Sequence, residues 1–462
     1  MMFRIPLLFH KMSRVAGEAL HPSFELGHRF NGKSGFYEPC GEAVMADFHF
    51  YEVNPGDEIC LEPDAGGYSG GYVYQAPFYS DSIDDRFIHT YCYSEEESWA
   101  TFTGNIRERS WRRRPLRIRK HGWIRLAMRK ADGSVLTDED RQAAREGIAL
   151  FCRKQSYCPK ECFAGEIEST VRSVLSLKTP DTLVFGLMAD SHFVINGGWE
   201  DTVSNIRQVN EGIPFDGMIH LGDITDGMTP ATITGEYAGR VLSDLESLGC
   251  PLYVALGNHD ANYFKGNPEP FTVRKQSELY LGRTEPYYTV DYAGHRFRLL
   301  VLYSFDHTQV GQEKRYGFPP EEVEWVRKIL DETPKDWKVL VCSHVPLLAG
   351  MHYWSKAIRN GPEMAQVMED YIRDGGHLLA YIHGHVHADQ INAESLSFPV
   401  VAVGCAKAED DQVHKAPGST TWTRRMGDVT QELWDVLVVD TKTGRLDFVR
   451  FGAGEDRSIA GR

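Results

Sequence analysis

The sequence predicts an α/β protein that carries a separate all-β domain at its N-terminus. At 462 residues the chain is too long for one ordinary hydrophobic core. From Leu183 onward, short apolar runs alternate with helical or loop segments, which is the pattern of an α/β domain. Residues 20–135 are instead rich in Gly, Tyr, Phe and Trp, with turn signals between short segments, as in a β-sandwich. We therefore expect a β-sandwich domain (1–135), a helical linker (136–165) and an α/β domain (166–462).

The last strand expected in the N-terminal domain runs from Trp123 to Lys130. It resembles the final strand of jelly-roll modules that accompany enzymes acting on glycans. The strand ends a basic run, Arg107 to Lys130, whose only acid is Glu108. A solvated strand face plus a loop is one interpretation of this run, and a surface for an anionic ligand or a partner is the other. Trp111, Trp123 and Arg112 to Arg114 also motivate the hypothesis that this domain binds a glycan or an anionic polymer.

The sequence predicts the approximate bounds of three helices. Thr137, followed by three acids, is a helix-capping residue, so a helix should run from about Asp138 to Phe151. Glu166 to Leu177 has apolar residues at helical spacing. Glu321 to Leu330 is amphipathic and belongs to the α/β series.

Five short apolar runs are each followed by residues that bind metals. Runs of four to eight apolar residues closed by Gly or polar residues are typical of buried strands. The runs are Leu183–Met188, Met218–Leu221, Leu252–Leu256, Val339–Cys342 and Leu378–Ile382. In open α/β sheets ligands gather at the carboxyl ends of the strands. We therefore expect the side chains behind these five runs to converge.

The residues behind the runs predict a centre for two metal ions. A carboxylate can bridge two cations that lie about 3.5 to 4 Å apart, and Asp223, which follows Gly222, is the candidate bridge. The remaining ligands would be Asp190, His192 and His387 at one ion, and Asn258, His344 and His385 at the other. Mixed imidazole and carboxylate ligands suit Mn, Fe, Zn or Co better than Ca.

The motifs resemble, in their order along the chain, those of the calcineurin-like metallophosphoesterases. They are Asp-x-His, Gly-Asp-x-x-Asp, Gly-Asn-His-Asp, a lone strand-end His and Gly-His-x-His, within residues 166–456. The resemblance implies a four-layer α/β/β/α sandwich and two divalent metal ions, Mn, Fe or Zn. It also implies that His259 protonates the leaving oxygen. In the protein-phosphatase branch an acid at the position of Asp226 orients that histidine, and the spacing here permits the same pairing. Asp260 is expected to be a structural partner of its loop.

Departures from the family patterns narrow the expected function. Asp226 stands where purple acid phosphatases have a tyrosine, and Gly227 stands where protein phosphatases have an arginine, so both branches are disfavoured. We expect a phosphodiesterase that uses a metal-bound hydroxide and a general-acid histidine on a small phosphorylated substrate. This preference comes from resemblance to the small bacterial branch that hydrolyses cyclic nucleotides and glycerophosphodiesters.

Two alternatives stay open. One is a phosphomonoesterase that acts on a small metabolite or a sugar phosphate. The other is a protein that binds a glycan or an anionic polymer and uses the metal domain as a scaffold.

Charge, hydropathy and cysteine content bear on partners and location. A formal net charge of -15 argues against nucleic acid and anionic membranes, because phosphate backbones are bound by clustered Lys and Arg. No apolar stretch approaches the roughly 20 residues of a membrane helix, and Ile5–Phe9 is too short for a secretory segment. The nine cysteines are an odd number, which favours reduced thiols. We expect a cytoplasmic protein.

Overall fold

The chain forms two compact units in the computed structural model, Met1–Cys158 and Pro159–Arg462. The boundary between them lies within the predicted linker. No helix among the residues that the structure describes is long and apolar enough to cross a membrane. The described residues are 18–20, 24–30, 37–47, 51–53, 58–63, 68–75, 90–91, 116–117, 122–130, 134–153, 161–193, 198–229, 231–309, 315–351, 355–407, 424–425 and 427–461.

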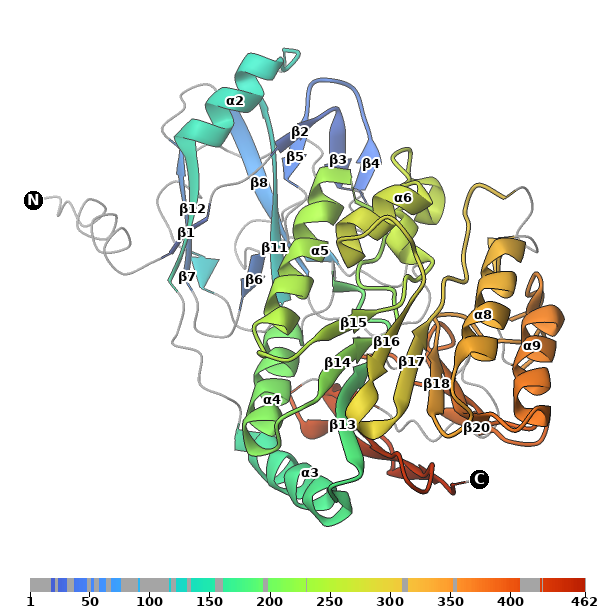
Figure 1. The fold of residues 1–462 in the computed structure, drawn as a ribbon. Coiled ribbons are helices and arrows are strands. Elements are labelled where there is room, and N and C mark those ends of the chain that lie inside the picture. Colours follow the sequence, from blue (N-terminus) through green and yellow to red (C-terminus); the bar gives the residue numbers. More distant parts are fainter. Residues whose placement is uncertain are drawn as a thin grey trace, which may run out of the picture. The chain divides into compact units, whose positions relative to one another are not determined.

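The first unit is built from antiparallel strands (Figure 1). They are β1 (Glu18–Leu20), β2 (Phe24–Leu26), β3 (His28–Phe30), β4 (Tyr37–Pro39), β5 (Met45–Asp47), β6 (Tyr51–Val53), β7 (Glu58–Pro63), β8 (Tyr68–Gln75), β9 (Thr90–Tyr91), β10 (Leu116–Arg117), β11 (Gly122–Lys130) and β12 (Ile148–Arg153). One sheet has the order β1-β12-β7-β10 and another the order β2-β5-β11-β8-β9, with β6 also paired to β11. β3 and β4 form a two-stranded ribbon. Trp111 and Arg112 to Arg114, which motivated the polymer-binding alternative, lie outside the described residues.

Helix α2 (Asp138–Gly147) begins where the capping signal predicts it. The Thr137 backbone N–H donates to the Asp140 carboxylate at 2.7 Å, and Thr137 Oγ1 accepts from the Asp140 N–H at 3.4 Å. The helix ends at Gly147, so the expected extension to Phe151 is wrong. The apolar residues from Ile148 onward pair as β12 with β1 and β7. Glycine is a weak helix former, and the strand pairing that follows it is non-local, which helical spacing cannot reveal.

The second unit contains two six-stranded sheets, with the orders β15-β14-β13-β22-β23-β24 and β16-β17-β18-β19-β21-β20. Their strands are β13 (Thr182–Met188), β14 (Gly217–His220), β15 (Leu252–Val254), β16 (Tyr288–Tyr292), β17 (Phe297–Val301), β18 (Lys338–Cys342), β19 (His377–His383), β20 (Gln390–Asn392), β21 (Val400–Ala402), β22 (Leu433–Asp440), β23 (Leu446–Gly452) and β24 (Arg457–Ile459). The helices are α3 (Ala164–Leu177), α4 (Trp199–Gly212), α5 (Ala231–Glu246), α6 (Val273–Gln276), α8 (Pro320–Glu332) and α9 (Gly361–Arg373). Short 3-10 turns and one π turn complete it: η1 (Glu161–Phe163), η3 (His259–Ala261), η4 (Phe264–Gly266), η5 (Ser277–Leu281), η6 (Ala293–His295) and η7 (Val429–Gln431).

Three apolar cores separate four layers, as the α/β/β/α prediction requires. Alternate residues of a strand face opposite sides of its sheet. On β13, Val184 packs with residues of α3, α4 and α5, whereas Phe185 packs with the second sheet. On β18, Leu340 faces the first sheet and Val341 packs with residues of α8 and α9. Figure 1 shows α3, α4 and α5 beside the first sheet, and α8 and α9 beside the second. The predicted fold class is confirmed.

Strand direction brings the ligand loops together. β13, β14 and β15 are parallel neighbours, as are β17, β18, β19 and β21. The carboxyl ends of β13, β14 and β15 therefore share one edge of the first sheet, and those of β18 and β19 share one edge of the second. The loops that follow these five strands carry the predicted metal ligands.

Candidate metal centre

The backbone is strained where the ligands lie. Five candidate ligands have left-handed φ values: Asp190 (55°), His192 (40°), Asp223 (54°), His385 (69°) and His387 (51°). Residues with a Cβ rarely adopt this conformation, and it persists mainly where the surrounding structure fixes it for a function. The strain therefore marks these loops as a site independently of the sequence motifs.

Glycines let the ligand loops approach one another closely. A Cβ on Gly257 would lie 2.2 Å from the backbone nitrogen of Asp223, and a Cβ on Gly384 would lie 2.6 Å from Oδ2 of Asp190. Gly222 has a φ of +96°, which places the bridging candidate behind a left-handed turn. The glycine in each motif thus has a steric reason, because any side chain there would push two ligand loops apart.

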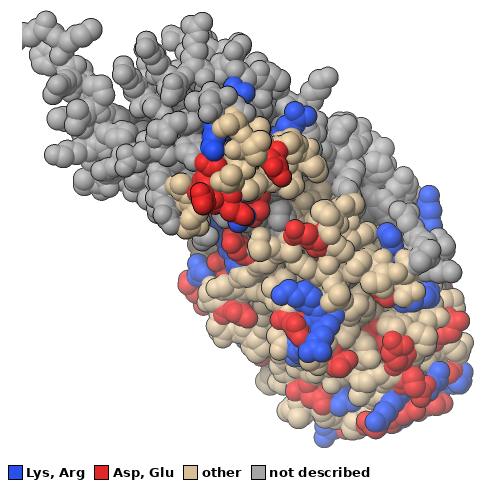
Figure 2. All heavy atoms as spheres, turned by 90° about the horizontal axis from the view of Figure 1, so that it is seen from above, with Lys and Arg blue, Asp and Glu red and all other residues tan. Residues whose placement is uncertain are grey.

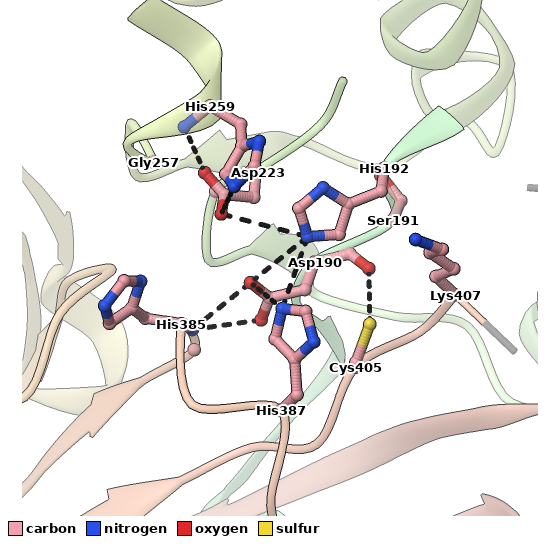
Figure 3. Close-up of polar contacts among 12 residues, drawn as sticks. Asp190, Ser191, His192, Asp223, Gly257, His259, His385, His387, Cys405 and Lys407 are labelled. Atoms are coloured by element: carbon pink, nitrogen blue, oxygen red, sulfur yellow. Dashed lines mark hydrogen bonds and ion pairs between the residues drawn. The ribbon is translucent and has the colours of Figure 1, made fainter. Parts of the chain in front are cut away.

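The first group of ligand atoms comes from the loops after β13 and β19 (Figure 3). Nε2 of His192 lies 3.3 Å from Nε2 of His387. Oδ1 of Asp190 lies 3.5 Å from Nε2 of His387 and 3.9 Å from Nε2 of His192. These three side chains are the ones assigned to one metal ion from the sequence.

The second group shares Asp223 with the first. Oδ2 of Asp223 lies 3.9 Å from Nε2 of His192 and 3.2 Å from Nε2 of His344. Oδ1 of Asn258 lies 3.1 Å from the same His344 nitrogen. The ligand atoms of Asp223, His344 and His385 all lie within 4.8 Å of one another. The structure therefore brings all seven predicted ligands together, with Asp223 between the two groups.

The donor set fits two divalent metal ions. Asp190 and Asp223 are buried carboxylates in one site, an arrangement that cations would neutralise. Nδ1 of His344 hydrogen-bonds the Leu221 carbonyl at 2.8 Å, which directs Nε2 into the site. Nδ1 of His192 lies 3.0 Å from Oδ1 of Asp226, which directs its Nε2 the same way. Metal-binding histidines commonly have such outer partners.

The electrostatics of the metal-free site centre on the pair formed by Asp223 and His344. Burial alone would lower the pKa of His344, but the carboxylates of Asp223 and Asp190 raise it to about 9. Burial opposes ionisation of Asp223, yet His344 and His259 hold its pKa well below the usual range. Burial lowers the pKa of His385 to about 3. In the metal-free protein, His344 is thus the cation that balances the bridging carboxylate.

Asp226 does not orient His259 through its carboxylate. Nδ1 of His259 lies 2.7 Å from the backbone carbonyl oxygen of Asp226, while the Asp226 carboxylate lies against His192. The carbonyl accepts the Nδ1 proton, which leaves Nε2 of His259 directed at Oδ2 of Asp223, 3.9 Å away. The pairing of the two residues exists, but the sequence cannot tell a backbone contact from a side-chain contact.

Asp260 organises the loops, as expected of a structural partner. Its carboxylate accepts hydrogen bonds from the backbone N–H groups of Asp223 (3.0 Å), Ile224 (2.9 Å) and Gly257 (2.8 Å). Burial and the charge of Asp223 raise the pKa of Asp260 to about 7. This carboxylate ties the loop after β14 to the loop after β15.

One segment of the site, Gly404 to Lys407, was not predicted from the sequence. Sγ of Cys405 donates to the Asp190 carbonyl at 3.0 Å, and the N–H of Lys407 donates to the same oxygen at 3.2 Å. The positive charge of Lys407, whose side chain is buried, helps to lower the pKa of Asp226 against the effect of burial. A signal was present, because Val400 to Val403 is a sixth apolar run closed by a glycine and a metal-binding residue type.

Parts of this chain are similar to known proteins. Residues 183–389 match the model of the calcineurin-like phosphoesterase family. A probable cyclic nucleotide phosphodiesterase of Synechococcus sp. is 24% identical over 177 residues, which are 38% of this chain and 59% of that protein. A dimetal phosphatase from Danio rerio aligns with a TM-score of 0.45 and 15% identity, over 61% of this chain and 99% of its own. A purple acid phosphatase from yellow lupin (Lupinus luteus) seeds aligns with a TM-score of 0.41 and 13% identity, over 96% of this chain and 74% of its own.

The family match covers the strands and loops that carry all seven candidate ligands, from β13 to the residues just beyond His387. Residues 183–389 of this chain belong to the calcineurin-like phosphoesterase family.

Proposed function

We propose that this protein is a metal-dependent hydrolase of small phosphodiesters. The observation that carries the proposal is the position of Asp223, whose Oδ2 lies between two groups of buried imidazole and carboxylate ligands. Two divalent ions held in this way would neutralise charge on the phosphoryl group and lower the pKa of water at the site. The buried, fixed ligand loops supply the preorganisation that such a site needs.

His259 is the proposed general acid for the leaving oxygen. The residue is 8% exposed, about as much as the candidate ligands His385 (8%) and His387 (7%). The ring is held from behind by the Asp226 carbonyl at Nδ1 and lies against Phe264, with the ring centroids 4.3 Å apart. A histidine fixed at one nitrogen can present a proton at the other, which is the geometry of a general acid.

Two further observations support a small diester as the substrate. The matched relative is itself named a probable cyclic nucleotide phosphodiesterase. On the face shown in Figure 2, basic and acidic side chains of the described residues are interspersed rather than gathered into a basic surface. A nucleic-acid substrate would instead favour clustered Lys and Arg.

The test compares two chromogenic esters with the full-length chain loaded with Mn²⁺. We expect faster turnover of bis(p-nitrophenyl) phosphate than of p-nitrophenyl phosphate, and no turnover of either by the metal-stripped protein. Faster turnover of the monoester would replace the diesterase proposal with a phosphomonoesterase. Failure to hydrolyse either ester, with two metals bound, would contradict the proposed chemistry altogether.

A further inference from the structure

Cys405 lies beside the first ligand group and is 1% exposed. Its Sγ and a ring nitrogen of both His192 and His387 all lie within 4.8 Å of one another. Both imidazoles belong, together with Asp190, to the group of ligands already assigned to one metal ion. Ligand atoms bonded to one ion at about 2.0 to 2.3 Å lie at most about 4.4 Å apart, so the sulfur needs little or no movement to share their ion.

The segment that carries this thiol is held firmly against the end of β13. The N–H of Ala406 donates to the carbonyl of Ala189 at 2.8 Å. The guanidinium of Arg424 donates to the carbonyls of Cys405 and Lys407, both at 2.6 Å. Figure 3 shows Cys405 next to His387, with its sulfur directed towards the Asp190 backbone oxygen. The position of the sulfur is therefore fixed by the fold.

The hydrogen bond that the thiol now makes can be replaced. Sγ donates to the Asp190 carbonyl at 3.0 Å, but that oxygen also accepts from the N–H of Lys407 at 3.2 Å. Loss of the thiol proton would leave the buried carbonyl still hydrogen-bonded, which avoids the cost of an unsatisfied polar group.

We propose that Cys405 is a sulfur ligand of the metal ion held by Asp190, His192 and His387. This inference rests on the proposed function, since it concerns one of the two metal sites. As the sulfur–metal bond forms, the thiol proton passes to solvent. Thiolate ligands select zinc and iron over manganese and magnesium. The ion at this position is therefore zinc or iron, while the all-nitrogen and oxygen group around His344 is less selective.

Cobalt substitution reports sulfur ligation directly. The full-length chain is stripped of metal and loaded with two equivalents of Co²⁺, and its near-ultraviolet absorption is recorded. We expect a sulfur-to-cobalt charge-transfer band that is absent from Cys405→Ser, which keeps a hydrogen-bond donor but lacks sulfur. Cys250→Ser, which changes a half-buried cysteine outside the site, should keep the band. X-ray absorption of the zinc-loaded protein should show a sulfur neighbour at about 2.3 Å.

The outcomes separate this inference from the proposed function. Two bound metals and ester hydrolysis, without a charge-transfer band or a sulfur neighbour, would overturn the ligand role of Cys405 and leave the hydrolase intact. A band that persists in Cys405→Ser would assign the sulfur to another cysteine and overturn it too. Failure to bind any metal would contradict the proposed function. Because the wild-type X-ray absorption needs no variant, poor folding of Cys405→Ser leaves a decisive measurement.

Discussion

At the residue scale, Asp223 is the side chain on which both ligand groups depend. Asp223→Asn removes a charge and one good ligand atom from both metal positions, so we expect activity to be lost and metal occupancy to fall at both. Metal content by mass spectrometry, measured beside ester hydrolysis, checks this. Asp331→Asn, an exposed change on α8, is the control and should keep two metals. Loss of only one metal from Asp223→Asn would contradict the bridging position.

As the proposed general acid, His259 should behave differently from the metal ligands, because its proposed role is in proton transfer. We expect His259→Ala to keep both metals and to slow turnover by about 10²- to 10⁴-fold, the usual range for general acid catalysis. His295→Ala, in η6, should leave turnover unchanged. If His259→Ala lost metal, the residue would have to be reassigned as a ligand.

Asp226 offers a test that follows from the structure rather than from the motif. Its carboxylate lies 3.0 Å from Nδ1 of His192, while only its backbone carbonyl contacts His259. Asp226→Asn should therefore weaken metal binding by about 10- to 100-fold, as with other outer partners of metal-binding histidines. The proton transfer by His259 should survive once metal is saturating. Metal titration followed by turnover at saturation distinguishes the effects; normal metal affinity with slow turnover would restore the pairing expected from the sequence.

At the scale of elements, the sequence was informative wherever a local pattern decides the structure. The five apolar runs became β13, β14, β15, β18 and β19, and their motif residues meet because those strands share sheet edges. The helix from Asp138 was placed correctly at its capped start and wrongly at its end. Ile148 to Arg153 form a strand because β1 and β7 are available as partners, and no local periodicity encodes that.

The part of the candidate site that local sequence patterns encode was predictable. The part that depends on contacts between residues far apart in the sequence was not. Ligand types placed directly after strands were recognisable, whereas the carboxylate of Asp226 contacts a histidine 34 positions earlier in the chain and not the one expected. Cys405 and Lys407 follow the short strand β21, which separates them from the family motifs. Only the pairing of β21 with β19 shows that they return to the site.

The antiparallel strands β22, β23 and β24 support the loop after β19, which carries His385 and His387, through buried charged side chains. Arg450 contacts Asp389 (2.7 Å) and Asp435 (3.0 Å), and both carboxylates are fully buried. Arg450→Met leaves these acids short of a partner, so we expect the free energy of unfolding to fall by about 3 to 5 kcal/mol. Arg296→Met breaks an exposed pair with Asp336 and should cost at most about 1 kcal/mol. Urea midpoints compare the two, and equal losses would show that the buried network adds no stability.

At the scale of the whole molecule, the second unit is two sheets whose edges meet at a cluster of charge. Asp190 and Asp223 extend from the first sheet, and His344, His385 and His387 from the second. Without metal, the negative charge of Asp223 is balanced by the proton on His344. Bound metal ions would add ligand bonds from both sheets, so they would stabilise the fold as any ligand of the native state does.

The coupling of metals and protons gives this stabilisation a defined pH dependence. The pKa of His344 is raised to about 9 in the metal-free protein, above an ordinary value of about 6.5. Its pairing with Asp223 therefore stabilises the metal-free fold fully below about pH 6.5, and this contribution disappears as the pH rises through about 9. Metal needs the neutral imidazole, so each pH unit from about 6.5 to 9 should strengthen binding of the ion at His344 by about tenfold, or about 1.4 kcal/mol.

The measurement is the rise in melting temperature on adding Mn²⁺ at fixed free concentration, from pH 6.5 to 9. We expect the rise to grow with pH, and the part due to His344 to level off near pH 9. His385 should not contribute, because burial lowers its pKa to about 3 and it is already neutral throughout. His344→Gln should make the dependence less steep even if it also weakens binding, because one of the protons that compete with the metals is gone. A rise independent of pH in the wild type would mean that His344 carries no proton in the metal-free site.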